Sequence, residues 1–135
     1  MRSPKEIAHR FAETYARPES PALEAIQREI FGADAWVRGY TTIAQADLLG
    51  RRLGLKPGVL LLDLGCGQGW PSVRLAAATG CSVIMSDVPR GATAAAAAQA
   101  RREGVQALCS FLQASATHLP FREGAFDAVL HTDTL

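Results

Sequence analysis

The sequence has no excess of charge of one sign and no long apolar run near its amino terminus. Its 135 residues carry 14 basic and 13 acidic side chains, a formal net charge of +1, without a block of like charge. This balance argues against a nucleic-acid partner. The segment MRSPKEIAHRF at the start contains no continuous apolar stretch. We therefore expect neither a secretory signal nor membrane insertion.

Cysteine is scarce and odd in number. Cys66, Cys81 and Cys109 are widely spaced, and each lies in or beside an apolar segment. This arrangement favours free, buried thiols over a disulfide or a metal site, and it indicates a cytoplasmic protein. No histidine or carboxylate pair stands at ligand spacing, so we expect no metal.

One stretch organises the chain, Val59–Trp70, with the sequence VLLLDLGCGQGW. Its apolar residues are interrupted only by Asp63 and lead into three glycines at alternate positions. Such a run predicts a buried strand of a parallel sheet. The glycines allow a tight turn and a close approach to a ligand, because no Cβ intervenes. A helix over residues 71–79 follows, and strand–loop–helix units of this kind bind nucleotide-like ligands in open α/β sheets.

Capping residues and periodicity predict the remaining elements. Helices are expected over residues 4–16, 21–31, 43–53 and 92–102, and further strands over residues 82–86, 107–113 and 126–131. The caps include Ser3 with Glu6 and Thr42 with Gln45. We expect residues 1–55 to form an amino-terminal helical extension and residues 56–135 to form the sheet.

The glycine spacing resembles motif I of the class I S-adenosylmethionine-dependent methyltransferases. The pattern is D-x-G-x-G-x-G, and Trp70 stands where a dinucleotide fingerprint needs its third glycine. The resemblance implies that the loop passes under the methionine end of the cofactor and that Asp63 orients its ammonium group. The residues implied in this contact are Asp63, Gly65, Cys66, Gly67 and Gly69. The alternative for Asp63 is a carboxylate satisfied by loop amides.

Asp87 ends the second strand, where its two oxygens can accept hydrogen bonds from the vicinal hydroxyls of a ribose. The alternative is a turn cap before Val88 and Pro89; Val88 is also expected at the cofactor. Further on, Ser115-Ala116 and the later Leu-Pro-Phe turn resemble the family's adenine-binding signature. Ser115 replaces the usual acidic residue there, so its hydrogen bond to the exocyclic amine carries no charge and is expected to be weaker.

Three more residues are candidates. His131 follows the fourth strand, where it can contact the cofactor or act as a general base for the acceptor; the alternative is a strand-end histidine bonded to a backbone carbonyl. Tyr40 and Thr42 resemble a turn that closes over the methionine end of the cofactor in small-molecule methyltransferases. Their alternative is a loop that packs on the core, with Thr42 capping a helix.

The resemblance implies a three-layer, Rossmann-like α/β fold. The parallel sheet is partial, in the order 3-2-1-4, with helices on both faces and a helical extension. We expect methyl transfer from S-adenosylmethionine to a small-molecule or lipid acceptor, with this chain carrying the cofactor-binding half. The alternative function is a non-catalytic S-adenosylmethionine-binding module; a nicotinamide-dependent oxidoreductase is a more distant one. The fourth strand leaves an open edge, so we expect either the amino-terminal part of a longer enzyme or pairing with another chain, such as a homodimer.

Overall fold

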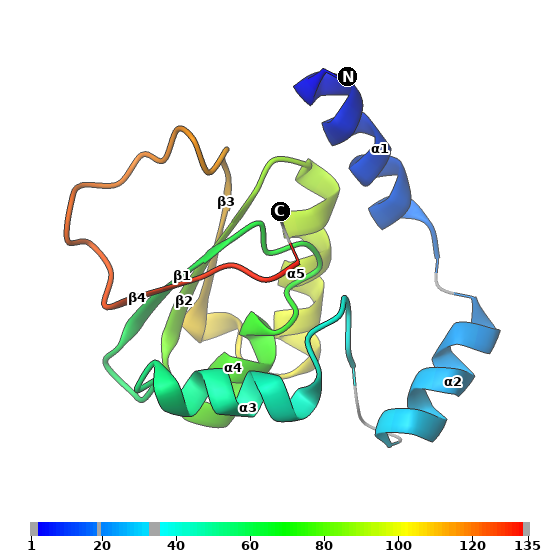
Figure 1. Ribbon diagram of the computed structural model, residues 1–135, viewed down its shortest axis with the longest axis horizontal. Coiled ribbons are helices and arrows are strands. Elements are labelled where there is room, and N and C mark those ends of the chain that lie inside the picture. Colours follow the sequence, from blue (N-terminus) through cyan, green and yellow to red (C-terminus); the bar gives the residue numbers. More distant parts are fainter. Residues whose placement is uncertain (1–2, 19, 33–35, 134–135) are drawn as a thin grey trace.

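The computed structural model describes residues 3–18, 20–32 and 36–133 (Figure 1). Its elements follow the expected order. In sequence they are α1 (Pro4–Ala16), α2 (Pro21–Phe31), α3 (Ile43–Arg52), β1 (Leu60–Leu64), α4 (Ser72–Thr79), β2 (Ser82–Asp87), α5 (Arg90–Arg102), a 3₁₀ turn (Gln106–Leu108), β3 (Cys109–Gln113) and β4 (Ala128–Leu130).

The first three helices begin where their side-chain caps predict. Ser3 and Glu6 form a reciprocal capping box at α1, Ser20 accepts the Leu23 N–H at α2, and Thr42 with Gln45 repeats the box at α3. Each cap satisfies backbone N–H groups that the first helical turn leaves without partners. The third strand begins later than predicted, at Cys109, because the residues just before it form the 3₁₀ turn.

The four strands form one parallel sheet in the order β3-β2-β1-β4, as the sequence predicts. Helix α4 connects β1 to β2, and α5 connects β2 to β3. Because all strands are parallel, their carboxyl ends meet at one edge of the sheet, where ligands of open α/β folds bind.

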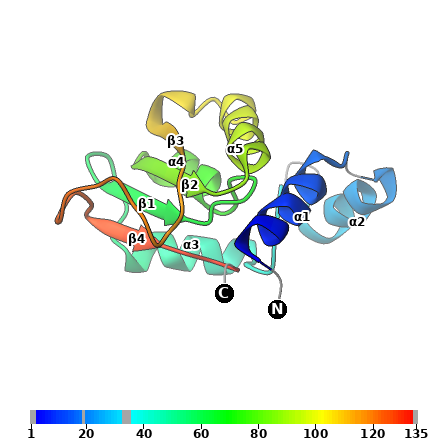
Figure 2. The ribbon, with the colours of Figure 1, turned by 90° about the horizontal axis from the view of Figure 1, so that it is seen from above.

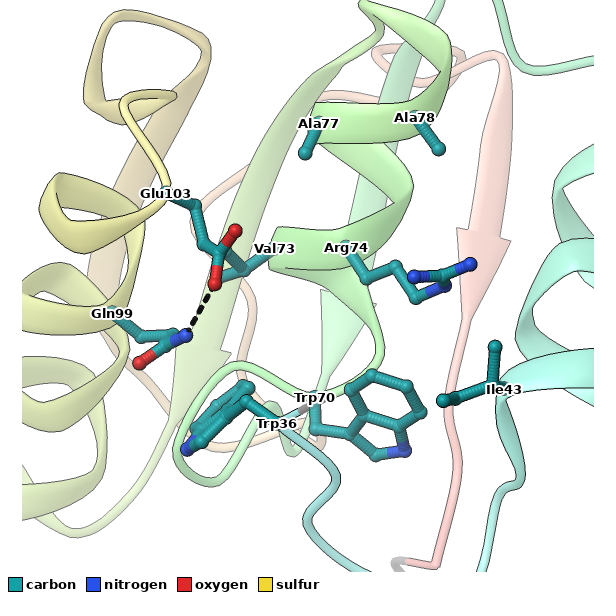
Figure 3. Close-up of a pocket in the computed structure, with 9 residues that line it drawn as sticks. All are labelled: Trp36, Ile43, Trp70, Val73, Arg74, Ala77, Ala78, Gln99 and Glu103. Carbon is teal, nitrogen blue, oxygen red and sulfur yellow. Dashed lines mark hydrogen bonds between the residues drawn. The ribbon is translucent and has the colours of Figure 1, made fainter. Parts of the chain in front are cut away.

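Helices α3, α4 and α5 lie side by side on the same face of this sheet. Helix α4 is flanked by the other two, with the strands behind it (Figure 3). The strand residues that face them are fully buried, among them Leu61, Val83 and Met85. These side chains and the inner faces of the helices make up the hydrophobic core.

The opposite face of the sheet carries no helix within the described residues, although helices were expected on both faces. Leu62, Ile84 and Val129 are paired in register on that face, and Val129 is 53% exposed. The crossovers through α4 and α5 run in the same direction across the sheet, so right-handed connections place both helices on one face. Only the return from β3 to β4 crosses the other way, and residues 114–127 form no helix.

Helices α1 and α2 lie together at one side of the sheet (Figures 1 and 2). Helix α1 contacts α5, whereas α2 buries none of its residues. The apolar residues of α2 therefore stay open to solvent, and Ile30 is 65% exposed. The described part of the chain holds no helix long and apolar enough to cross a membrane.

A close approach at Gly69 fixes how α5 packs on the sheet. A Cβ added to Gly69 would lie 2.9 Å from Val73 Cγ2 and 3.2 Å from the backbone Cα of Ala96. Gly69 also has a φ of +97°, which other residues rarely adopt. The space between the loop and α5 therefore accepts only glycine at this position.

We expect Gly69→Ala to destabilise the chain more than Gly58→Ala. Gly58 has a similar φ of +90° but nothing within 4 Å of the added Cβ, so its substitution measures backbone strain alone, about 1–2 kcal/mol. Gly69→Ala adds the cost of displacing α5, about 1–3 kcal/mol more. Urea unfolding followed by circular dichroism measures both, and equal losses would contradict the packing argument.

Candidate functional site

The glycine loop, Gly65–Gly69, is fastened to the end of β2. The N–H groups of Gly65 and Cys66 donate to the carbonyl of Ser86 at 2.8 and 3.0 Å. The N–H of Gly67 donates to Asp87 Oδ2 at 2.7 Å. All three glycines of the loop have a positive φ. The loop therefore turns sharply at the carboxyl ends of β1 and β2. The two carboxylates predicted from the sequence, Asp63 and Asp87, both lie at this end of the sheet and are close enough to interact electrostatically.

Asp63 is a buried carboxylate whose Oδ2 has no partner among the described residues. Its side chain is 1% exposed, and the hydroxyl of Ser72 is also without a partner. Burial raises the pKa of Asp63 to about 7, and the Asp87 charge adds to the rise. The Ser72 hydroxyl, which lies near the carboxylate but outside hydrogen-bond geometry, acts as a weak donor and opposes the rise. Loop amides do not satisfy Oδ2, so this oxygen stands ready for a donor or a cation.

Asp87 already accepts two backbone hydrogen bonds. Oδ2 takes the Gly67 N–H, and Oδ1 takes the N–H of Val88 at 2.7 Å. The second bond matches the turn cap considered from the sequence. A carboxylate has about four acceptor positions, so Asp87 can hold the loop and still accept two hydroxyl donors. Its carboxylate is half-buried at the mouth of the loop.

Cys66 is buried inside the loop, and burial raises the pKa of its thiol. It donates its backbone N–H to Ser86, as above, and contributes its Sγ only to a contact with the carbonyl of Gly67. A thiol held in this state is a packing group rather than a nucleophile. Within the described residues no three His, Cys, Asp or Glu side chains are grouped to hold a metal ion.

Tyr15 covers the glycine loop, a role that the sequence does not reveal. Its hydroxyl oxygen lies 3.2 Å from the position that a Cβ on Gly67 would occupy. Burial raises the pKa of Tyr15 to about 12, and the charge of Asp87 adds to this rise. The regular spacing of Ile7, Phe11 and Tyr15 predicts one face of a helix. Ile7 and Phe11 are 44% and 48% exposed. Of these three residues, Tyr15 alone packs against the glycine loop.

Ser115 and Ala116 lie beside Asp87. The N–H of Ala114 donates to the carbonyl of Asp87 at 3.0 Å, and Gln113 Nε2 donates to the carbonyl of Val88 at 2.8 Å. These bonds hold the segment after β3 against the end of β2. Ser115 is half-buried there, whereas Ala116 is exposed.

The remaining candidates, His131, Tyr40 and Thr42, form no hydrogen bond with the glycine loop among the residues that the structure describes. His131 is exposed and follows β4, whose Leu130 pairs in register with Asp63, so it emerges at the same end of the sheet as the loop. Tyr40 is 91% exposed, and its N–H donates to Asp133 Oδ2 at 2.9 Å. The hydroxyl of Thr42 caps α3. The cap is therefore confirmed for Thr42, and a contact of Tyr40 or Thr42 with a cofactor stays a prediction.

A hollow of about 260 Å³ lies outside this group of residues (Figure 3). It opens over the outer side of α4, between α3 and α5, with the rings of Trp36 and Trp70 at one end. The two rings meet edge to face, with centroids 6.3 Å apart. Trp70 Nε1 donates to the carbonyl of Thr41. The hollow thus marks where the turn after the glycine loop packs against the segment before α3.

Comparison with known proteins places the sequence among methyltransferases. Residues 61–135 match the family described as "Methyltransferase domain". Methyltransferase GfsG of Streptomyces halstedii is 38% identical over 78 residues, 58% of this chain and 28% of that protein. Sterol 24-C-methyltransferase ERG6B of Gibberella zeae is 33% identical over 81 residues, 60% of this chain and 21% of that protein. The match thus spans less than a third of each relative.

Solved structures show the same fold. The [4+2]-cyclase SpnF is 36% identical with a TM-score of 0.60, covering 64% of this chain and 32% of that one. A methyltransferase from Thiobacillus denitrificans, solved with S-adenosyl-L-homocysteine, is 22% identical with a TM-score of 0.64, covering 86% of this chain and 45% of that one. The Rossmann-like fold class is thereby confirmed.

The buried Asp63 makes stability depend on pH. Its folded pKa, about 7, lies above the unfolded value, so the folded chain binds more protons between these values. Stability is then highest below the unfolded pKa and falls as pH rises through the folded pKa, by about 4 kcal/mol. We expect Asp63→Asn to remove the contribution of this carboxyl group to the pH dependence of stability. The free energy of unfolding in urea should then vary less with pH in the variant than in wild type between about pH 4 and 8. A constant difference between wild type and variant over this range would contradict the assignment.

Proposed function

The chain belongs to the methyltransferase-domain family, and from this premise we propose that it binds S-adenosylmethionine at the glycine loop. We further propose that it carries the cofactor-binding half of an enzyme that methylates an apolar small molecule or lipid. The curated relatives it matches are several times longer than the matched segment. Activity, acceptor and partners are therefore proposals about a larger catalytic unit.

The observation that carries the proposal is the orphaned carboxylate oxygen of Asp63. A buried, unpaired carboxylate is costly, and a cation removes that cost. S-adenosylmethionine carries an ammonium group on its amino-acid end. The glycines beside Asp63 let this end approach the backbone, because no Cβ fills the space. Asp63 would accept from the ammonium group, and the loop would support the methionine portion.

Two further contacts follow from the ends of β2 and β3. Asp87 keeps free acceptor positions for the two ribose hydroxyls while it holds the Gly67 N–H. Ser115 and the N–H of Ala116 stand next in space, where they would take the exocyclic amine and a ring nitrogen of adenine. Tyr15 would close the loop from above. These assignments use only residues that the structure places around one edge of the sheet.

The cofactor supplies an activated methyl group on a sulfonium. The protein then has little covalent chemistry to perform, and its residues act by orientation and by excluding water. Asp63 and Asp87 would fix the two ends of the cofactor, and Tyr15 would limit solvent access at Gly67. His131, at the end of β4, would accept the proton of an acceptor hydroxyl as a general base.

An apolar acceptor is favoured over a nucleic acid by two features. The chain has a net charge of only +1, and one matched relative is named as a sterol methyltransferase. Ile7 and Phe11 would add apolar surface beside Tyr15.

The free, buried cysteines favour the cytoplasm. The remainder of the catalytic domain, or a second copy in a homodimer, would cover the outer edge of β4 and the open sheet face.

A specific observation favours a second candidate function, a module that binds the cofactor without transferring its methyl group. The relative SpnF, at 36% identity, is named as a cyclase rather than a methyltransferase. Ser115 also departs from the acidic residue of the family signature. In this case binding would be retained and transfer would be absent.

Binding is tested by calorimetry with two ligands that differ at the amino-acid end. We expect the chain to bind S-adenosylhomocysteine, and Asp63→Asn to weaken it about 10- to 100-fold, since a hydrogen bond to a charged group is lost. The control ligand, 5′-methylthioadenosine, has no ammonium group, so the same variant should bind it as wild type does. Equal losses for both ligands would contradict the role of Asp63, and no binding of either would contradict the proposal.

Transfer is tested on the complete catalytic unit, in which the acceptor-binding half is also present. The assay uses radiolabelled S-adenosylmethionine and a panel of hydroxylated sterols, terpenoids and polyketides. We expect His131→Gln to leave the affinity for S-adenosylhomocysteine unchanged and to lower the transfer rate about 100-fold or more, because a general base is removed. An unchanged rate would leave His131 as a strand-end residue. Binding without transfer to any acceptor would favour the non-catalytic module.

A further inference from the structure

Ser115 belongs to a short chain of hydrogen bonds that ends at a histidine. Its Oγ lies 2.8 Å from Thr117 Oγ1, and Thr117 Oγ1 lies 2.9 Å from His118 Nδ1. The N–H of Thr117 also donates to Ser115 Oγ at 3.3 Å. The Ser115 hydroxyl is therefore connected, through one other hydroxyl, to a titratable ring.

Which atoms donate in these two hydrogen bonds depends on whether His118 Nδ1 carries a proton. A neutral ring with its proton on Nε2 accepts at Nδ1, so Thr117 donates to it and Ser115 donates to Thr117. Ser115 then keeps an acceptor lone pair for an outside donor. A protonated ring can only donate, which reverses both bonds. Ser115 then accepts from Thr117 twice, through O–H and N–H, and its own proton is left to donate outward.

We propose that His118 is a specificity-determining positioning residue that sets whether Ser115 accepts from or donates to the 6-position of the bound purine. This inference rests on the proposed cofactor site. With neutral His118 that carries its proton on Nε2, Ser115 accepts from the 6-amino group of adenine and takes the place of the carboxylate in the family signature. With protonated His118, Ser115 donates and suits a 6-oxo group instead. Recognition of adenine at this site thus weakens on acidification.

Few charged side chains belong to the elements next to the Ser115–Thr117–His118 hydrogen bonds or to the same loop. Asp87 at the end of β2 is bonded to Gly67 and Val88, and Arg90 begins α5. The same loop later carries Arg122 and Glu123. In the parts of the chain that the structure describes, none of these groups forms an ion pair with His118. Thr117 is its hydrogen-bond partner, so protonation of the ring is transmitted to Ser115 through that one hydroxyl.

The experiment compares 5′-methylthioadenosine with 5′-methylthioinosine, which differ in the 6-substituent of the base and in the proton that the 6-oxo base carries on N1. The N1 difference is the same at every pH in the range tested, so it does not change how the affinity ratio varies with pH. Calorimetry gives the ratio of their affinities between about pH 5.5 and 7.5, where histidine changes its charge. Neither ligand has an ammonium group, and the ratio cancels pH effects common to both, including those of Asp63 and Asp87. For wild type we expect the preference for the adenine ligand to fall about three- to tenfold on acidification, the worth of one neutral hydrogen bond.

Two variants test the relay itself. His118→Phe should give a ratio that does not change with pH, because the titrating ring is gone. Ser115→Asp should give a high, constant preference for adenine, because a carboxylate accepts whatever the state of His118. A constant ratio in wild type, or a pH-dependent ratio in His118→Phe, would overturn the inference. Wild type that binds S-adenosylhomocysteine but shows a constant ratio refutes only this inference, whereas no binding of S-adenosylhomocysteine refutes the proposed function.

Discussion

The structure depends on a carboxylate held within an apolar layer. Asp63 lies on the helix-covered face of β1, two residues after the buried Leu61, and pairs in register with the buried Met85. A carboxyl group in such a place is stable either as the neutral acid or beside a cation. The fold is thereby coupled to protons and to cationic ligands. A ligand that supplies the cation stabilises the folded chain in proportion to its own binding.

The glycine loop follows directly after Asp63 and lies between this buried carboxylate and the edge of the sheet. Gly69 brings the loop against α5, and Gly67 leaves room for the hydroxyl of Tyr15. Asp87 has two tasks, since the same oxygen that holds the loop belongs to the carboxylate that would face the sugar. A change at Asp87 therefore acts on loop geometry and on ligand contact together, whereas Asp63 contributes little to holding the loop.

Helices α3, α4 and α5 all cover the same face of the sheet and leave the other face open. The open face carries apolar residues such as Ile84 and Val129, and β4 has an unpaired outer edge in the described sheet. The carboxyl ends of the strands, where the proposed cofactor site lies, are in place without a second helical layer. Under the proposed function, the cofactor would contact the glycine loop and the ends of β2 and β3, whereas the acceptor would lie near β4. The two binding events would then depend on different parts of the sheet.

The sequence by itself determined the elements, their order, the parallel sheet and the glycine loop with Asp63 and Asp87. These follow from local signals, since caps, apolar runs and glycines act within a few residues. Only the tertiary structure decided that Tyr15 covers Gly67, that Tyr40 faces solvent and that Asp63 Oδ2 has no partner among the described residues. Those facts depend on how separate segments pack and on which side chains meet, and no local pattern encodes such distances.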